Sequence, residues 1–281
     1  MQLRVPARRG EEASLKHFPA ARNTTRRQGV CMPCKAVFLD VGWTLAYPER
    51  SIWEVFADVC RAGGTAVAAA DCEDAVGALR RQFRGQQEQA FRDGARYSDS
   101  DAEFTGGFAQ MGALVRARFG IEADADDFNR RFFAGFWTEG NWRTFPEVLD
   151  VIDDLRRAGA RVGVLSNAPT NLPAFLDELG IAPLLDFAVV SATEGVRKPD
   201  RRIFEVALRR AGVAPDEAMH VGDMYLEDVL GGRAAGVTPL LIERGERSLF
   251  PRFPESEGRD LQPDAIVRDL CAVRDRFLTE R

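Results

Sequence analysis

The chain has 281 residues, of which 45% are hydrophobic and 29% are charged, and its formal net charge is -5. These values are typical of a globular protein that can bury a large core, in one large domain or two modest ones. The negative balance gives no support for nucleic-acid binding, and no run of 18 apolar residues predicts a membrane span.

Residues 1–34 differ in composition from the rest of the chain. They carry seven Lys and Arg residues against two Glu, show no hydrophobic periodicity and lack the apolar segment of a secretory signal. We expect a disordered basic extension, with a transit peptide or a weak polyanion contact as the alternatives. Met32 precedes the first predicted strand and is an alternative start of translation.

Five cysteines are scattered along the chain, and two of them, Cys31 and Cys34, form a Cys-x-x-Cys motif. This spacing occurs in redox and zinc sites, but a second Cys or His pair at ligand spacing is missing. The motif also precedes a strand and does not open a helix. We therefore expect reduced thiols and a cytoplasmic protein.

The first predicted strand is the apolar run Ala36–Leu39, which is typical of a buried parallel strand. It delivers one carboxylate, Asp40, to its C-terminal end, just before a turn at Gly42. In open α/β sheets this edge is where ligands bind.

From residue 51 to about residue 138 the hydrophobic spacing is helical. The pattern predicts four helices, with Asp71 or Asp74 opening the second, and Asp99 or Asp101 the third. The fourth is expected to begin between residues 124 and 127. Their aromatic-rich stripe predicts the core of a small helical bundle and not a cofactor site.

From residue 141 onward, strands and helices alternate. The expected strands are residues 161–167, 187–191, 218–223, 238–242 and 265–267, and the expected helices are residues 148–158, 172–179, 202–211 and 226–235. This alternation predicts an α/β fold with a doubly wound parallel sheet.

Polar residues follow four of these strands at one edge of the predicted sheet. The groups are Asp40, Ser166 with Asn167, the loop of Lys198, and Asp223 with Asp228. The carboxylates suit Mg²⁺, which prefers hard oxygen ligands, and the other groups can neutralise and hydrogen-bond a phosphoryl oxygen. An ionised Asp beside a dication and a Lys is a competent nucleophile.

In this order the motifs resemble those of the haloacid dehalogenase-like (HAD) hydrolase superfamily, over roughly residues 35–268. The stretch from Asp40 to Thr44 is similar to its first motif, in which the first Asp becomes phosphorylated, and Ser166-Asn167 is similar to the second. Lys198 matches the third motif, and residues 222–228 match the acidic fourth motif that binds Mg²⁺.

The resemblance implies a Rossmann-like core, residues 35–46 and 141–281, with a helical cap inserted at residues 47–140. It further implies a Mg²⁺-dependent phosphatase of a small phosphorylated metabolite. The implied roles are catalysis by Asp40 and Lys198, phosphate binding by Thr44, Ser166, Asn167 and Lys198, and Mg²⁺ binding by Asp40, the Gly42 carbonyl, Asp223 and Asp228. For Asp228, ordering of Lys198 or of a metal-bound water is favoured over direct ligation.

One position departs from the pattern of the family. Most of its phosphatases have a second Asp two residues after the nucleophile, as general acid and base, and here that position is Gly42. General acid–base help is typically worth about 10²- to 10⁴-fold. We therefore expect slow cleavage of alkyl phosphates, whereas phenolic and acyl phosphates need less proton donation.

Two other readings stay open. Carbon–halogen cleavage also needs no second Asp, but Asp223 and Asp228 favour a phosphatase. A HAD-like binding or regulatory protein with negligible turnover is the alternative that Gly42 supports most directly.

Several other polar or aromatic residues are candidates with weaker claims. We expect His220 to be a structural residue, and Arg92, Arg96 and Arg143 to be solvated or salt-bridged. For Trp43, contact with substrate or cap and simple space filling are equally compatible with the sequence.

Overall fold

The computed structural model describes residues 33–137, 140–259, 261–262 and 265–280. The basic extension expected at the N-terminus, the alternative start at Met32, and Cys31 of the Cys-x-x-Cys motif therefore lie outside the described residues. Cys34 is buried, and its thiol donates a hydrogen bond to the carbonyl oxygen of Ala36.

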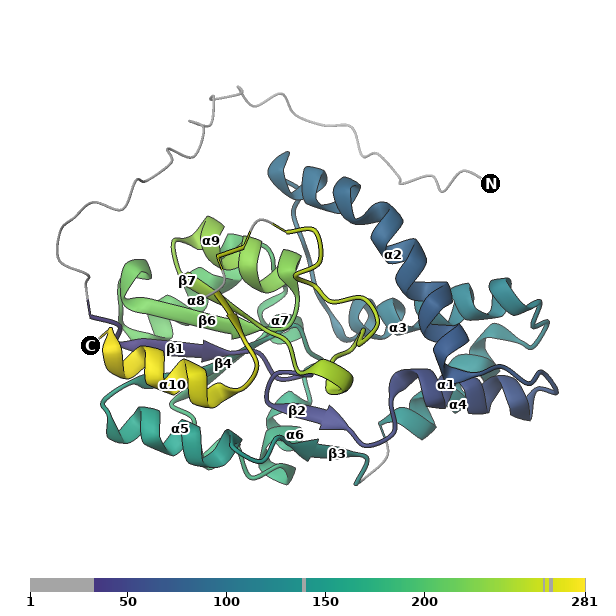
Figure 1. Ribbon diagram of the computed structural model, residues 1–281, viewed down its shortest axis with the longest axis horizontal. Coiled ribbons are helices and arrows are strands. Elements are labelled where there is room, and N and C mark those ends of the chain that lie inside the picture. Colours follow the sequence, from purple (N-terminus) through teal and green to yellow (C-terminus); the bar gives the residue numbers. More distant parts are fainter. Residues whose placement is uncertain (1–32, 138–139, 260, 263–264, 281) are drawn as a thin grey trace. The chain divides into compact units, whose positions relative to one another are not determined.

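A six-stranded parallel sheet forms the centre of the fold and confirms the predicted fold class (Figure 1). The strands lie in the order β5-β4-β1-β6-β7-β8. They are β1 Ala36–Leu39, β4 Arg161–Ser166, β5 Phe187–Val190, β6 Ala218–Gly222, β7 Thr238–Ile242 and β8 Ile266–Val267. Because β4 and β6 flank β1, the ends of these three strands meet at one edge.

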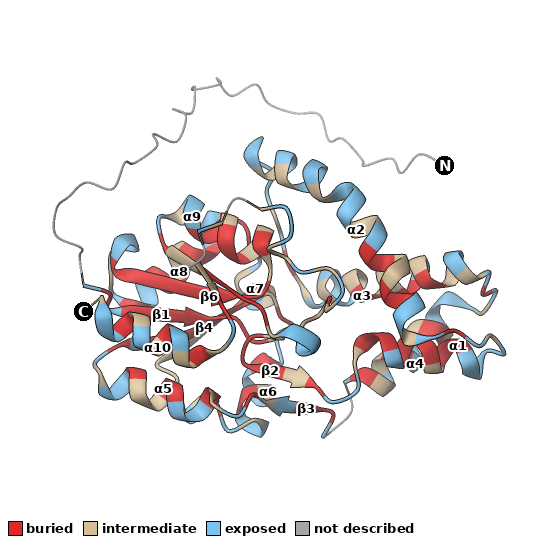
Figure 2. Ribbon diagram, in the orientation of Figure 1, coloured by how far each residue is buried: buried red, intermediate tan, exposed pale blue. Residues whose placement is uncertain are grey.

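Helices cover both faces of the sheet (Figure 1). On one face lie α5 Val148–Arg157, α6 Leu172–Glu178 and α10 Leu270–Thr279, and on the other lie α8 Arg201–Ala211 and α9 Gly231–Ala235. The short helix α7 Ser191–Glu194 directly follows β5. The residues of β1 alternate between the two cores, since Val37 and Leu39 pack in one and Phe38 in the other. Figure 2 shows the strands buried and the outer helix faces exposed.

Short helical turns complete this part of the chain. Three are 3₁₀ turns and the fourth is a π-helix; they are Ala182–Leu184, Pro215–Glu217, Gly245–Arg247 and the π-helix Tyr225–Leu230. The π-helix takes the first half of the helix predicted at residues 226–235, and it begins inside the acidic motif at residues 222–228. The remainder of that helix is α9.

Four helices follow β1 and form the cap of this structure. They are α1 Ile52–Ala62, α2 Ala69–Arg92, α3 Asp101–Phe119 and α4 Ala125–Phe136. A two-stranded antiparallel ribbon, β2 Ala46–Pro48 with β3 Trp142–Thr144, joins the two chain crossings between cap and sheet. The sequence did not predict this ribbon, because strands of three residues are too short to show alternation.

The aromatic stripe of the cap packs as a core, as predicted. Phe56 of α1 stacks on Phe132 of α4 with ring centroids 4.2 Å apart, and Phe128 and Phe136 are buried beside them. The predicted start of the second helix was wrong, because α2 begins at Ala69, before Asp71, with Ala68 as its N-cap. Helix α3 begins at Asp101, one of the two starts predicted for it, and Ser100 is its N-cap.

The loop between β7 and β8 is fastened to α2 of the cap. The Arg252 backbone N–H donates to the buried carboxylate of Glu73 at 3.0 Å, and its guanidinium pairs with Asp74 at 3.0 Å. A second ion pair joins Arg80 of α2 to Glu255 at 3.0 Å. The loop expected at residues 250–254 is therefore a structural link between the cap and the α/β core.

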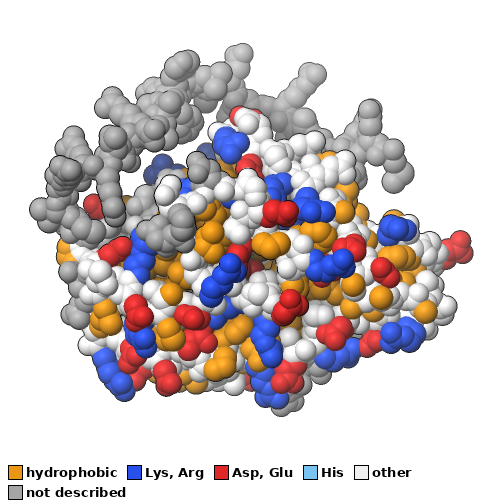
Figure 3. Space-filling model, in the orientation of Figure 1, with side chains coloured by type: hydrophobic (Ala, Val, Ile, Leu, Met, Phe, Trp, Pro, Cys, Tyr) orange, Lys and Arg blue, Asp and Glu red, His pale blue; other side chains and the backbone are white. Residues whose placement is uncertain are grey.

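The surface carries mixed charges. On the face drawn in Figure 3, acidic and basic side chains of the described residues are interspersed with apolar ones. Among the helices of the described residues, none has the length and apolarity that crossing a bilayer would require.

We predict that Phe132→Ala lowers the free energy of unfolding by about 3–5 kcal/mol, because it removes a fully buried ring from the aromatic core of the cap. Urea denaturation measures the change. Leu278→Ala is the control, since Leu278 is 48% exposed and should change stability by less than about 0.5 kcal/mol. Equal effects of the two substitutions would contradict the packing described here.

Candidate active site

The predicted site residues gather at the C-terminal ends of β1, β4 and β6. Asp40 follows β1, Ser166 ends β4 and Asp223 follows β6. The strands are paired in register, with Leu39 opposite both Val164 and Val221. The three polar residues are therefore delivered to adjacent positions along one edge of the sheet.

Lys198 lies at the centre of this edge and is 2% exposed. Its Nζ donates to Asp40 Oδ1 at 2.8 Å, to Asp228 Oδ1 at 2.7 Å and to the Leu165 carbonyl oxygen at 3.0 Å. Burial alone would lower the pKa of Lys198, but the two carboxylates outweigh burial and raise the pKa. The ammonium therefore stays charged, with all three of its protons used.

Asp228 is held on several sides. His220 Nε2 lies 2.8 Å from its Oδ1, and the Met224 backbone N–H donates to its Oδ2 at 2.9 Å. Burial would raise the pKa of Asp228, but Lys198 and His220 outweigh it and bring the pKa below its usual range. Asp228 thus contacts Lys198 directly, and its predicted role in ordering Lys198 stays a prediction.

His220 contacts the Asp228 carboxylate, and Gly222 leaves space for it. His220 is fully buried, and its Nδ1 lies 3.2 Å from the Phe38 carbonyl oxygen, so both ring nitrogens have partners. This confirms the expectation of a structural histidine. At Gly222 a Cβ would lie 2.1 Å from Cγ of Asp228, so the close approach of that carboxylate requires glycine.

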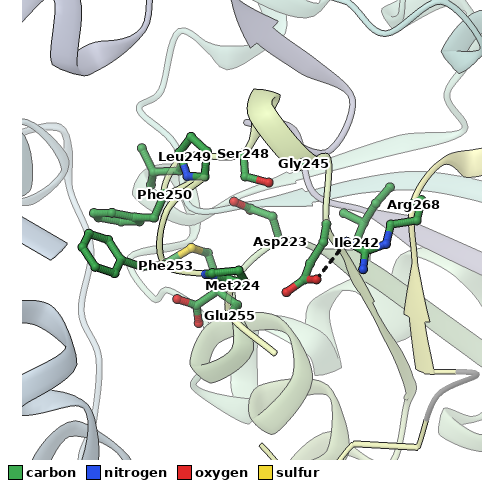
Figure 4. Close-up of a pocket in the computed structure, with 13 residues that line it drawn as sticks. Asp223, Met224, Ile242, Gly245, Ser248, Leu249, Phe250, Phe253, Glu255 and Arg268 are labelled. Carbon is green, nitrogen blue, oxygen red and sulfur yellow. Dashed lines mark hydrogen bonds and ion pairs between the residues drawn. The ribbon is translucent and has the colours of Figure 1, made fainter. Parts of the chain in front are cut away.

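Asp40 and Asp223 are two buried carboxylates, and the neighbouring positive charge is too small to balance them. Burial raises the pKa of Asp40 despite the opposing effect of Lys198. The pKa of Asp223 is raised well above its usual value by burial and then by Asp40. Among the described residues, the Asp223 carboxylate has no hydrogen-bond or ion-pair partner. It lines a small cavity of about 50 Å³ beside the loop after β7 (Figure 4).

A divalent cation fits this pair of carboxylates, because it supplies the charge that they lack. The described part of the chain contains no group of three or more His, Cys, Asp or Glu side chains placed to hold a metal ion. A cation here would therefore have the carboxylates of Asp40 and Asp223, a backbone carbonyl such as that of Gly42, and water. This mixture of few carboxylates and retained waters is typical of Mg²⁺.

The loop after Asp40 is open at Gly42 and strained at the next residue. A Cβ at Gly42 would meet nothing within 4 Å. Trp43 has φ 53°, a left-handed conformation that is unfavourable for a bulky side chain. Thr44 is fully buried, and its hydroxyl has no hydrogen-bond partner among the described residues. Thr44 thus lies behind the site surface, and its predicted contact with phosphate stays a prediction.

Ser166 and Asn167 lie on the β4 side of the site. A hydrogen bond from Ser166 acts to lower the pKa of Asp40. The side-chain amide of Asn167 accepts from the Lys198 backbone N–H at 2.8 Å and donates to the Lys198 carbonyl at 3.1 Å. Asn167 therefore fastens the Lys198 loop, a role that the sequence did not predict, and keeps one amide proton for another acceptor.

A large cavity of about 1120 Å³ opens next to these residues. Gly42, Ser166 and Asn167 line it from the sheet edge, and Phe104 and Phe133 line it from α3 and α4 of the cap. Asp101 of α3 accepts hydrogen bonds from the Thr170 backbone N–H at 2.7 Å and from its hydroxyl at 2.8 Å. This second link between cap and core was missed, because it joins residues 69 positions apart without any local pattern.

Two of the arginines that the sequence singled out form ion pairs. Arg92 lies 3.4 Å from Glu88, and Arg143 pairs with Glu49 at 2.8 Å, so both are salt-bridged as expected. Trp43 packs edge-to-face against Trp142 and also lines the large cavity, which is compatible with both of its earlier interpretations.

The fold and the charged cluster define a class of α/β hydrolases that has a helical insertion after the first strand. A family model described as haloacid dehalogenase-like hydrolase matches residues 34–236, and the chain belongs to this family.

Individual relatives extend the comparison. The chain is 28% identical over 245 residues to haloacid dehalogenase-like hydrolase domain-containing protein 3 of Danio rerio, covering 85% of this chain and 94% of that protein. It is 41% identical over 134 residues to the glyceraldehyde 3-phosphate phosphatase of Methanothermobacter thermautotrophicus, covering 47% of this chain and 58% of that enzyme. Among solved structures, the HAD hydrolase YfnB of Bacillus subtilis bound to magnesium has a TM-score of 0.59 and 15% identity, covering 87% of this chain and 99% of that one.

We predict that Asn substitutions at two neighbouring acids change stability in opposite directions in metal-free buffer. Asp223→Asn should stabilise the protein by about 0.5–2 kcal/mol, because it removes a buried charge without a partner. Asp228→Asn should destabilise it by about 3–5 kcal/mol, because it breaks a buried ion pair.

Urea denaturation at pH 7 in the presence of a chelator measures both changes. Because the pKa of Asp223 is raised in the folded state, its ionisation favours unfolding at any pH above the usual carboxyl pKa. The stability gained by Asp223→Asn should therefore shrink as the pH falls. Shifts of the same sign for both variants would contradict the charge assignment.

Proposed function

We propose that the chain is a Mg²⁺-dependent phosphatase of a small phosphorylated metabolite, acting through an aspartyl-phosphate on Asp40. One observation carries the proposal most directly. The charged Lys198 is locked between Asp40 and Asp228, and the unpartnered carboxylate of Asp223 lies at the adjacent strand end. The names of relatives that are phosphatases support the same reaction class.

Asp40 is the proposed nucleophile. Its Oδ1 is occupied by Lys198, which leaves Oδ2 to form the bond to phosphorus. The ammonium of Lys198 and the hydroxyl of Ser166 lie at the same carboxylate, where they can neutralise and hydrogen-bond the transferring phosphoryl oxygens. Bound Mg²⁺ would supply further charge neutralisation at those oxygens.

Positioning residues hold this arrangement together. Asp228 fixes the Lys198 ammonium, His220 fixes Asp228, and the Asn167 amide fixes the Lys198 backbone. Phosphoryl transfer depends mainly on such positioning and on neutralised charge. In the second half of the reaction, water attacks the phosphorus and releases Asp40.

A second candidate function is favoured by a single observation, the absence of an acid at Gly42. It is a HAD-like protein that binds its ligand with negligible turnover. Carbon–halogen hydrolysis would also proceed without that acid, but it gives no role to the unpartnered carboxylate of Asp223.

We predict Mg²⁺-dependent release of inorganic phosphate from a panel of phosphate esters and acetyl phosphate. Asp40→Asn should abolish the release, because the nucleophile is lost, and a chelator should abolish it reversibly. Asp275→Asn is the matched control, since Asp275 is an exposed acid on α10, and its activity should equal that of the wild type.

Three other results would each contradict a part of this proposal. Phosphate release that survives Asp40→Asn would remove Asp40 as the nucleophile. Saturable binding of Mg²⁺ and beryllofluoride without any turnover would establish the binding protein instead. Halide release from 2-chloropropionate in metal-free buffer, without phosphate release, would establish the dehalogenase.

A further inference from the structure

The large cavity beside Gly42 has aromatic walls on both sides. Its volume of about 1120 Å³ lies slightly above the usual range of small-molecule sites, which ends at about 1,000 Å³. The core and the cap each contribute three rings, and these are Trp43, Trp142, Phe175, Phe104, Phe133 and Trp137.

Five of these rings differ from those of the packed core of the cap, whereas Trp142 is buried and belongs to that core. Trp137 is 38% exposed, and Trp43, Phe104, Phe133 and Phe175 are partly exposed, whereas Phe132 behind them is buried. Trp137 and Trp142 stack with centroids 5.1 Å apart, and Phe175 meets the ring of Trp142 edge-on. The wall is thus a preassembled group of rings that still presents apolar surface to water, and a planar apolar group would cover it.

The cavity offers little to a negatively charged group. Among the described residues that line it, the only basic side chain is Arg143, which is already paired with Glu49 at 2.8 Å. The acid Asp101 is occupied by Thr170, and Glu178 adds a further negative charge. A second phosphate or carboxylate on the substrate would therefore find no free cation there, whereas a neutral ring needs no cationic partner.

The position of the cavity relative to Asp40 decides which part of a substrate enters it. Ser166, beside the Asp40 carboxylate, and Gly42 both line its wall. A phosphoryl group at Asp40 would consequently direct its ester substituent into this space. That substituent is the leaving group, and it would pass the site where the family's acid is replaced by Gly42.

The open space at Gly42 restricts the chemistry of the leaving group. Gly42 has no side chain that could donate a proton, so we expect the leaving oxygen to depart with the electron pair of the P–O bond as an anion. A phenolate does this readily because phenols ionise near pH 10, whereas an alkoxide does not. The aromatic wall of the cavity and the missing acid at Gly42 thus independently favour an aromatic leaving group.

We propose that the cavity receives a neutral aromatic leaving group, and that the substrates are aryl phosphates, the phosphate monoesters of phenols. This inference rests on the proposed phosphatase function. Asp40 Oδ2 forms a bond to phosphorus as the bond from phosphorus to the phenolic oxygen breaks, and the phenolate takes its proton from water. Water then adds to phosphorus, the bond to Asp40 breaks, and phenol and inorganic phosphate are the products.

The test compares leaving groups in the full chain with Mg²⁺ at one pH. The probes are a series of substituted phenyl phosphates, 2-naphthyl phosphate, glyceraldehyde 3-phosphate and acetyl phosphate. We expect kcat/KM for the aryl phosphates to exceed that for glyceraldehyde 3-phosphate by about 10²-fold or more, and to rise steeply with the acidity of the phenol.

Gly42→Asp separates the effect of the missing acid from the effect of the aromatic cavity wall. It restores a carboxyl group in a space that accepts one, so glyceraldehyde 3-phosphate should gain about 10²- to 10⁴-fold, and the dependence on phenol acidity should flatten. Trp137→Ala should raise KM for 2-naphthyl phosphate about 3- to 10-fold and leave KM for acetyl phosphate unchanged. Phe83→Ala is the control, because Phe83 is also 38% exposed but lies on α2 and does not line the cavity.

Equal kcat/KM for aryl and alkyl esters would overturn the inference while leaving the phosphatase intact. An unchanged KM for 2-naphthyl phosphate in Trp137→Ala would likewise remove the cavity from recognition. Failure of every probe, including the activated acetyl phosphate, would overturn the phosphatase function itself and this inference with it.

Discussion

The buried contact between Lys198 and two carboxylates is the interaction on which the rest of the site depends. Removing an ammonium from water is costly, and it is tolerated here because Asp40 and Asp228 both lie within 2.8 Å of Nζ. His220 and Gly222 serve this contact and make none of the proposed bonds to phosphate, and the Asn167 amide fastens the Lys198 backbone beside it. One lysine does not balance three buried acids, so the surplus charge at Asp223 is what suits the site to a cation.

The fold determines where that charge meets the substrate. Parallel pairing of β4, β1 and β6 brings the nucleophile, Ser166 and Asp223 to one edge, and the insertion after β1 places the cap beside it. The cap is fastened at Asp101 on one side and along the loop after β7 on the other. The backbone is strained at Trp43, and the ring of this residue forms part of the cavity wall.

Much of the fold and of the site could be predicted from the sequence, and the same physical reasons explain what could not be predicted. Apolar runs that end in Asp40, Ser166 and Asp223 predict strand ends, and parallel pairing then predicts their meeting. The partners of those residues were not predictable in the same way. That the Asn167 amide fastens the Lys198 loop, and that Thr170 meets Asp101, follows from contacts across the fold that leave no periodic signal. The helix start at Ala69 was missed because Asp71 and Asp74 are plausible caps by residue type, whereas the N-cap of α2 is Ala68, which makes no side-chain cap hydrogen bond.

The most direct measurement of the central claim is the identity of the phosphorylated residue. The protein would be quenched during turnover of 4-nitrophenyl phosphate with Mg²⁺, reduced with borohydride, and mapped by peptide mass spectrometry. An acyl phosphate on Asp40 predicts homoserine at position 40, and none at Asp223 or Asp228. Unmodified Asp40 in protein that is releasing phosphate, or reduction at another acid, would contradict the account.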